Sequence, residues 1–519
     1  MKKNLSSNMS DGKVKFLSKN IFIPLTIIGI VAFLIRLYYF QWDLPISEDA
    51  IQYFMYAGDI VTLGHLPDWI LANNGWPTFL SLIFSLVDSN NPFYYMQIQK
   101  LTTVFLSTVT IIPLYFISKR FFEPRFCLIA ISLFAFQPRL IESSLLGGTD
   151  HLYILLGTIA ICLFLHQNKK IMYSSFAVLS LMTMVRSEGL FLFVALSIIY
   201  FIRYRKIHFF IPKYIPALLI FVLILLPVMN ERIEVSGTDN IFIKTTTTFS
   251  YHTKPPEETG GESGLPFIIN GMKNFPIYVG WSLVPILICF VPIGFILMFR
   301  SLDYKKLTII FSLTLLSLPL FYIYAIDTQD IRYVFMLFPL FCLVSIYFIE
   351  KIDNKINKKN IFVLIFIIGI LITSFVFLEY KKVDITHEKE AEKIALYVLE
   401  NTRGFNDYHP ETQYIAPSNI IRYGDFPALS DNYRHNLPKS IVSDESSTIE
   451  EYIQVHKKEG LSHLILDGAE NRKKFFNQVF NNESDYPYLE KVFDSDEKEF
   501  KYHVKIFKID YKKFENEYG

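Results

Sequence analysis

Two adjacent carboxylates, Glu48 and Asp49, follow a long apolar run of this 519-residue chain. A carboxylate beside another negative charge and near a low-dielectric wall is suited to general-base chemistry. The alternative is structural, because Ser47, Glu48 and Asp49 also suit the first turn of an interfacial helix over 49–63. The residue types alone leave both interpretations open.

A second polar group contains Glu142 and the run Gly147-Gly-Thr-Asp150-His151. Asp150 fits a binding role and a helix N-cap equally well. Together with His65, the last two residues of the run are hard oxygen and nitrogen donors of the kind that hold metal ions. Their spacing matches no metal-binding signature, so the metal remains open.

Two further groups contain arginine. Arg186-Ser-Glu188-Gly189 interrupts an apolar stretch, and a buried arginine requires an anion, either Glu188 or a phosphate. In Asp327-Thr-Gln-Asp330-Ile-Arg332-Tyr333, Arg332 either clamps a phosphate or pairs with Asp330. Carboxylates and arginines together suit a reaction whose leaving group is a lipid phosphate.

The elements that carry these groups are predicted to span a membrane. Hydrophobic residues make up 51% of the chain and charged residues 19%, and the mean hydropathy is +0.31. This composition argues against an ordinary soluble enzyme, and the net charge of +1 gives no electrostatic basis for a nucleic-acid partner. Residues 21–380 hold long apolar runs, and 381–519 are polar. At roughly 20 residues per crossing, we expect about eleven spans, at 21–40, 97–118, 125–140, 150–166, 171–186, 188–203, 211–229, 277–299, 307–326, 333–350 and 361–380.

The distribution of lysine and arginine predicts the orientation. Basic residues occupy the tail 1–20 and alternate loops, whereas 41–76 contains none. By the positive-inside rule, the N-terminus is cytoplasmic and an odd number of crossings places 381–519 outside. The segments 41–76 and 230–276 are then long outer loops, and all four polar groups fall on the outer side.

The polar region 381–519 is predicted to be a small α/β domain. We expect helices at 387–401 and 469–480, strands at 412–416, 461–466 and 503–510, and a helix that begins with the capping box Ser447-Thr-Ile-Glu450. The predicted fold is therefore a polytopic α-helical membrane domain followed by a small extracytoplasmic α/β domain, with an accessory or acceptor-recognition role.

The order of motifs over roughly 30–380 resembles the GT-C superfamily of membrane glycosyltransferases, in its protein O-mannosyltransferase and lipid A aminoarabinose transferase branch. Asp49 stands four residues before Tyr53, and Gly64, Pro67 and Gly75-Trp76-Pro77 follow. Arg186 before Gly189, and Arg332-Tyr333 before Pro339, are similar to later family motifs. Where the family often has Asp-Glu, this chain has Glu48-Asp49, and it lacks the Trp-Trp-Asp-Tyr-Gly stretch of the oligosaccharyltransferase branch.

The resemblance implies an inverting transfer of a sugar from a polyprenyl-phosphate carrier to a protein, lipid or glycan outside the cytoplasm. Asp49 would be the general base, Arg186 and Arg332 would bind the donor phosphate, and Glu48, His65, Asp150 and His151 would shape the sugar site or a site for a divalent metal ion. The remaining polar residues expected at the substrate site are Tyr53, Glu142, Glu188, Asp330 and Tyr333. The expected location is the plasma membrane.

The competing interpretation is a non-enzymatic membrane protein, either a transporter or a scaffold for the outer domain. Transporters typically contain repeated halves with broken helices in corresponding positions. The sequence has no convincing internal repeat, and its polar groups lie at the ends of the predicted spans rather than midway along them.

The predicted orientation can be checked at Asn482-Glu-Ser484, a glycosylation sequon in the outer domain. In a host that modifies such sites, we expect added glycan mass on this segment. The sequons Asn4-Leu-Ser6 and Asn8-Met-Ser10 should stay unmodified because the N-terminal tail is predicted to be cytoplasmic. Mass spectrometry of the purified chain measures all three sites. An unshifted mass at Asn482 would mean that this site is not glycosylated, and it would then give no support to the predicted orientation.

Overall fold

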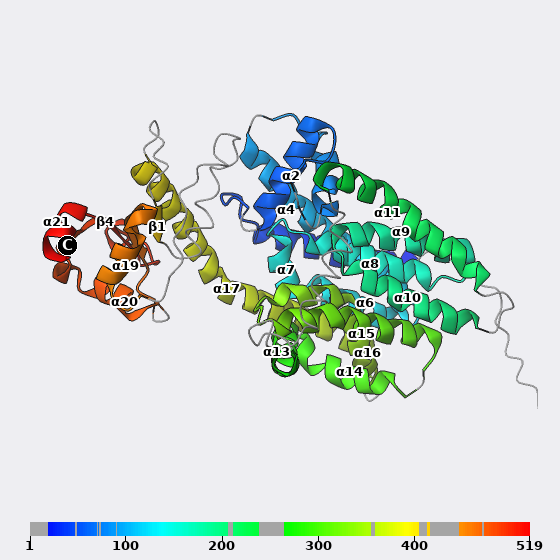
Figure 1. Cartoon of the computed structure of the whole chain (residues 1–519). Coiled ribbons are helices and arrows are strands. Elements are labelled where there is room, and N and C mark those ends of the chain that lie inside the picture. The colour runs from blue at the N-terminus through cyan, green and yellow to red at the C-terminus, as the bar shows by residue number, and fades with distance from the viewer. Residues whose placement is uncertain are drawn as a thin grey trace, which may run out of the picture. The chain divides into compact units, whose positions relative to one another are not determined.

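The structure is a computed structural model of the chain (Figure 1). It describes residues 19–46, 49–69, 71, 74–89, 91–205, 211–237, 264–300, 302–353, 359–403, 413–415, 446–469 and 472–518. The chain divides into two compact units. The first comprises Met1–Gln41 and Tyr56–Phe377, and the second comprises Trp42–Met55 and Leu378–Gly519.

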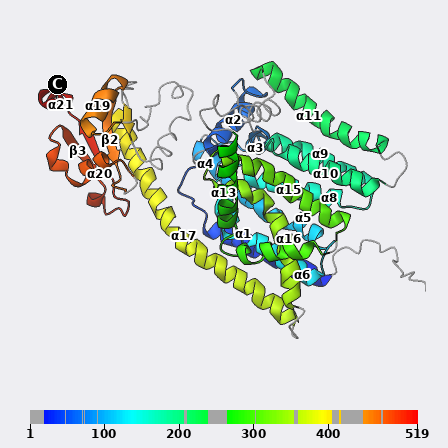
Figure 2. The same ribbon diagram turned by 60° about the horizontal axis from the view of Figure 1, so that its bottom comes forward.

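The first unit is a bundle of helices in which α9 packs between α8 and α11, and α10 packs against α15 (Figures 1 and 2). Its elements, with 3-10 helices marked η, are α1 (Lys19–Tyr38), most of α2 (Asp49–Leu63), α3 (Gly75–Phe84), α4 (Pro92–Val109), α5 (Ile111–Ser118), α6 (Pro124–Ala135), α7 (Pro138–Ser144), α8 (Asp150–Phe164), α9 (Lys169–Val185), α10 (Gly189–Tyr204), η1 (Pro212–Tyr214), α11 (Ile215–Ser236), α13 (Leu265–Leu283), η3 (Leu287–Cys289), α14 (Val291–Met298), α15 (Tyr304–Ala325), η4 (Ile331–Leu337), α16 (Phe338–Asp353) and the first part of α17 (Lys359–Arg403).

Several helices of this unit are long and apolar enough to cross a membrane. Within the described residues five qualify alone, and the pair α6 and α7, bent by 52°, makes a sixth if it counts as one span. The five are Pro92–Ser118, Pro212–Val235, Tyr304–Ala325, Ile331–Asp353 and Ile361–Val398. Shorter apolar helices include α8 and α10, so the total of eleven crossings stays a prediction.

Three regions of the bundle differ from the sequence prediction. The predicted outer loop 230–276 is helical at both ends, because α11 continues to Ser236 and α13 begins at Leu265. The predicted span 277–299 is broken, because α13 ends at Leu283 just before Pro285, and η3 and α14 follow as short pieces. Val284, the residue before Pro285, has an extended backbone, and the α conformation is disfavoured at this position, which accounts for the break. In addition, α3 was not predicted as a helix. It is only ten residues long, too short for the span criterion.

The bend between α6 and α7 is stabilised by a buried arginine. Pro138 begins α7, and the last carbonyl of α6, that of Ala135, accepts a hydrogen bond from Arg36 Nη1 at 3.0 Å. Arg36 is fully buried and also donates to Ala32 O and Ser107 Oγ, both at 3.0 Å. One guanidinium therefore joins α1, α4 and α6, and it satisfies a carbonyl that the bend leaves without a helical partner.

The second unit contains a four-stranded sheet in the order β1-β2-β4-β3. β1 and β2 are parallel, and the other two pairings are antiparallel. The strands are β1 (Gln413–Ile415), β2 (Leu461–Leu466), β3 (Leu489–Asp494) and β4 (Lys505–Ile509). The helices of this unit are the second part of α17 together with α19 (Ile449–His456), η6 (Lys457–Glu459), α20 (Lys474–Asn481), η7 (Glu483–Asp485), η8 (Asp496–Lys498) and α21 (Tyr511–Tyr518).

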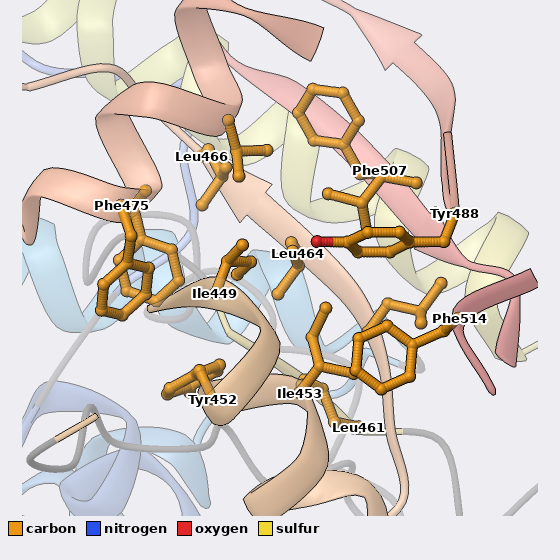
Figure 3. Close-up of a cluster of buried hydrophobic side chains, with 14 residues drawn as sticks. Ile449, Tyr452, Ile453, Leu461, Leu464, Leu466, Phe475, Tyr488, Phe507 and Phe514 are labelled. Atoms are coloured by element: carbon orange, nitrogen blue, oxygen red, sulfur yellow. The ribbon is translucent and has the colours of Figure 1, made fainter. Parts of the chain in front are cut away.

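Alternate residues of the strands face opposite sides of the sheet and contribute to two separate hydrophobic cores. Leu464 and Leu466 of β2 pack with α19, α20 and α21, as Figure 3 shows. Ile465, between them, packs on the other side with Ile394 and Val398 of α17. Because strand side chains alternate in direction, the sheet is covered by helices on both faces. This arrangement confirms the predicted small C-terminal α/β fold.

Several details of the C-terminal prediction were wrong. The predicted helix 387–401 is not separate but the end of the 45-residue α17. The helix cap is one residue later than predicted, since Thr448 Oγ1 accepts the Glu451 N–H and Glu451 binds the Ser447 N–H. β3 and α21 were not predicted.

A buried histidine in this sheet makes the stability of the second unit depend on pH. His463 lies on β2 opposite Lys508 of β4, and burial, with the nearby Lys508 charge, lowers its pKa to about 4. The unfolded chain, with a histidine pKa of roughly 6.5, then binds a proton that the folded sheet excludes. The contribution of a neutral His463 is therefore present above about pH 6.5 and is lost as the pH falls toward 4.

We expect acidification from pH 7 to pH 5 to destabilise β2 by about 2 kcal/mol through this group. Hydrogen exchange of the β2 amides in the full chain, corrected for intrinsic rates, measures the loss. The His463→Gln variant removes the titrating group and should lose less stability over the same interval. An equal loss in the wild type and the variant would contradict the assignment.

Candidate functional site: an ionic cluster where three segments meet

Three backbone segments, here called carriers, hold the side chains of the site. The first carrier is the corner before α8. Gly147 adopts a left-handed backbone conformation with φ of 76°, which glycine tolerates and other residues rarely adopt. Asp150 is the first residue of α8, and Tyr153 follows three positions later on the same face of the helix. The corner thereby presents a carboxylate and an aromatic ring together.

The second carrier is the tight connection between α9 and α10. Arg186 follows the last residue of α9, and Glu188 precedes Gly189, the first residue of α10. A Cβ added to Gly189 would lie 2.8 Å from Thr183 Oγ1 and 2.9 Å from the Thr183 backbone. Only glycine permits this close approach, which folds the connection back on α9 and holds Arg186 at its tip.

Arg186 lies between two carboxylates from these two carriers. Its Nη1 donates to Asp150 Oδ1 at 2.9 Å, and its Nη2 donates to Glu188 Oε1 at 3.0 Å. All three side chains are mostly buried, with 13%, 14% and 20% of the Arg186, Asp150 and Glu188 side chains exposed. Charge-assisted hydrogen bonds of this kind are stronger than neutral ones and fix the guanidinium in place.

The third carrier, η4, completes the cluster. The guanidinium of Arg186 lies 5.2 Å from the centre of the Tyr333 ring of η4 and 5.7 Å from that of Tyr153. These are cation–π distances. Asp150 is also close enough to Asp330 and Arg332 to interact with their charges. Segments more than 140 residues apart in sequence, around 186 and 332, therefore meet at one place.

Arg332 and Asp330 pair with each other at the start of η4. Arg332 Nε donates to Asp330 Oδ2 at 2.7 Å, and the Arg332 N–H donates to Asp330 Oδ1 at 2.8 Å. This was one of the two alternatives left open by the sequence. The Arg332 side chain is 33% exposed, more than twice the fraction for Arg186. The cluster therefore contains a buried guanidinium and a more accessible one.

Asp49, the described member of the predicted acidic pair, lies in the second compact unit. Asp49 is the first residue of α2 and is exposed, and Tyr53 is half-buried in the same helix. The α2 range coincides with the helix that the alternative interpretation of Glu48 and Asp49 predicted. Glu48 lies outside the described residues.

The other predicted site residues have separate surroundings. His65 is exposed, and its Nδ1 contacts the Leu66 carbonyl at 2.8 Å. Glu142 lies in α7, close to Arg139. His151 is buried near the Arg36 guanidinium. These surroundings do not test the roles predicted for the three residues, which stay predictions.

The described part of the chain contains no group of three or more histidine, cysteine, aspartate or glutamate side chains that could hold a metal ion. The carboxylates of Asp150 and Glu188 both form ion pairs with the Arg186 guanidinium. Within the described residues, which do not include Glu48, these two carboxylates therefore do not form a metal centre.

Sequence analysis missed two features near the site. Tyr153 faces Arg186, and its spacing of three from Asp150 on a helix could have identified it. Arg232, buried near the end of α11, donates to the Asn74 side chain, and the neighbouring Glu231 accepts the Leu66 N–H at 3.1 Å. The charged pair within the apolar helix was the available signal.

Comparison with solved structures shows the fold of the chain. ArnT from Cupriavidus metallidurans bound to undecaprenyl phosphate is similar with a TM-score of 0.55 at 9% identity, over 95% of this chain and 98% of that one. The Archaeoglobus fulgidus oligosaccharyltransferase in complex with Zn and sulfate is similar with a TM-score of 0.57 at 12% identity, over 90% and 71%. AglB from the same organism, in complex with an inhibitory peptide and a dolichol-phosphate, gives 0.54 at 11%, over 91% and 72%.

Neither protein-family models nor curated protein sequences match the chain. At 9–12% identity the structural likeness concerns the fold alone. It confirms the predicted resemblance at the level of the fold, and it does not separate the two branches, because ArnT and AglB are both similar.

The Asp150–Arg186 pair should be energetically coupled. Arg186→Gln should lower the thermal midpoint of the purified chain in detergent, because it leaves the buried Asp150 and Glu188 without their guanidinium, a loss on the order of 3 kcal/mol. Asp150→Asn should lower it less, because Arg186 keeps Glu188 as a partner. The double variant should lose clearly less than the sum of the single losses. The exposed pair Asp43–Lys389, at 2.9 Å, is the control and should show almost no coupling. Additive losses at 150 and 186 would contradict a stabilising buried pair.

Proposed function

We propose that the chain is an integral-membrane glycosyltransferase that moves a sugar from a polyprenyl-phosphate-linked donor to an acceptor outside the cytoplasm. The observation that carries the proposal is the ionic cluster around Arg186, assembled from three distant segments within a chain of GT-C fold. Undecaprenyl phosphate and dolichol-phosphate are bound in two of the similar structures, which supports a polyprenyl phosphate as the carrier.

The two arginines are assigned to the donor phosphate. Arg332 is the more exposed guanidinium and would contact the phosphate first, whereas Arg186 lies deeper, between Asp150 and Glu188. A positive charge fixed in a low-dielectric site stabilises the negative charge that appears on the departing phosphate. The cluster contains one more carboxylate than guanidinium, so Asp150 and Glu188 have capacity to accept hydrogen bonds from sugar hydroxyls.

Asp49 is assigned as the general base. It takes the proton from the acceptor hydroxyl or amine as the acceptor oxygen or nitrogen bonds to the anomeric carbon. The bond from that carbon to the phosphate oxygen breaks, and polyprenyl phosphate leaves from the opposite face, which inverts the configuration. Glu48, Tyr53, His65, Glu142, His151, Asp330 and Tyr333 remain candidates for the surroundings of the substrate. No step is assigned to a metal ion.

The proposed location is the plasma membrane, with the N-terminus in the cytoplasm. The segment 381–519 then lies outside, and we assign it an accessory role or a role in recognising the acceptor, which would be a protein, lipid or glycan. The distribution of basic residues in alternate loops supports this orientation.

The base assignment predicts the effect of Asp49→Asn. We expect this variant to transfer sugar from undecaprenyl-phosphate-linked hexoses and pentoses at least about 100-fold more slowly than the wild type, because general-base catalysis contributes roughly 100- to 10,000-fold. Its affinity for undecaprenyl phosphate should change little. Transfer rates and lipid binding are measured on the purified full chain in detergent.

Asp68→Asn is the matched control, since Asp68 is an exposed aspartate of the same predicted loop. It should retain wild-type activity. Equal activity of Asp49→Asn and the wild type would reject the base assignment. A wild-type chain that transfers no sugar from any of these donors would reject the glycosyltransferase and favour a transporter or scaffold.

A further inference from the structure

We infer that the adjacent residues Gly75 and Trp76, at the start of α3, are positioning residues that set the geometry of the Asp150–Arg186 pair. The functional part of this inference rests on the proposed function, in which the pair lies at the donor phosphate. Neither residue belongs to the ionic cluster. Each one instead contacts the backbone of a different carrier of that pair.

Trp76 holds the corner before α8. Its ring is fully buried, and its Nε1 donates to the carbonyl of Gly147 at 3.2 Å. Gln99 of α4 donates to the same carbonyl at 2.8 Å. Gly147 has the left-handed conformation described above, so both hydrogen bonds are made to the residue at which the chain turns. The two donors fix the corner three residues before Asp150.

Gly75 holds the other carrier. A Cβ added to Gly75 would lie 2.5 Å from the Met184 carbonyl carbon and from the Val185 nitrogen, and 2.6 Å from the Met184 oxygen. The start of α3 is therefore in direct backbone contact with the last residues of α9, immediately before Arg186. No flexible side chain lies between them, so any added atom must displace one backbone from the other.

The start of α3 is itself fixed on its other side. Asn74, the N-cap residue, is buried and accepts a hydrogen bond from buried Arg232 of α11. Its backbone carbonyl accepts hydrogen bonds from the Thr78 N–H and hydroxyl. Consecutive residues 75 and 76 thus act as a fixed spacer between the two backbones that carry Arg186 and Asp150. A side chain acting through backbone contacts alters substrate binding without touching the substrate.

The test uses Gly75→Ala and the milder Trp76→Phe, which keeps a large ring but removes the N–H donor. We expect Gly75→Ala to weaken undecaprenyl phosphate binding at least tenfold, and Trp76→Phe three- to tenfold. In an Arg186→Gln background these losses should largely disappear, because the pair that the two residues position is already broken. The thermal midpoints should be non-additive in part, because the steric cost of the Cβ at 75 remains when Arg186 is replaced, whereas the cost of disturbing the pair does not.

Gly369→Ala and Trp281→Phe are the matched controls. A Cβ at Gly369 meets open space, and Trp281 is largely exposed. Both should bind the lipid within twofold of the wild type. If the losses at 75 and 76 add fully to that of Arg186→Gln in the thermal midpoints, the positioning role is overturned. If the wild type does not bind undecaprenyl phosphate while the midpoints remain non-additive, the proposed donor fails and the positioning role stands.

Discussion

The structure of the helical unit depends on a single requirement, which is that a buried guanidinium must have its counter-charges within hydrogen-bond distance. Arg186 meets this requirement with two carboxylates, one from the start of α8 and one from its own connection. An uncompensated charge in a low-dielectric environment is so unfavourable that the carriers of these groups cannot separate independently. The meeting of α8, α9 and η4 at one end of their helices is therefore a consequence of charge neutralisation as much as of apolar packing.

The sequence identified most members of this cluster, because ionisable residues are conspicuous in a chain that is 51% hydrophobic. It could not select their partners. Arg186 had Glu188 or a phosphate as alternatives, and the structure adds Asp150, which is 36 residues away. That pairing is set by tertiary packing and has no local signal. Tyr153 and Tyr333 were harder to single out as contacts of the cation, because aromatic residues make up 16% of the chain.

For the fold, predictability followed the strength of the hydrophobic pattern. Long apolar runs identified the helices, whereas the ten-residue α3 and the strand β3, whose burial is interrupted by exposed polar residues, lacked such a signal. The change of composition near residue 380 predicted a domain boundary, and α17 passes through it without a break. An α-helix satisfies its own backbone hydrogen bonds in lipid and in water alike, so a change of environment need not end it.

The bend between α6 and α7 links two positions that are 102 residues apart in sequence. Pro138 begins the second helix, and Arg36 supplies the donor for the Ala135 carbonyl at the end of the first. An apolar residue at 36 would leave that carbonyl unpaired, while a straight helix through 138 would leave the arginine with one acceptor fewer. Among diverged copies of this chain, substitutions at these two positions should therefore arise together. Covariation of this kind would indicate that those copies have the same bend.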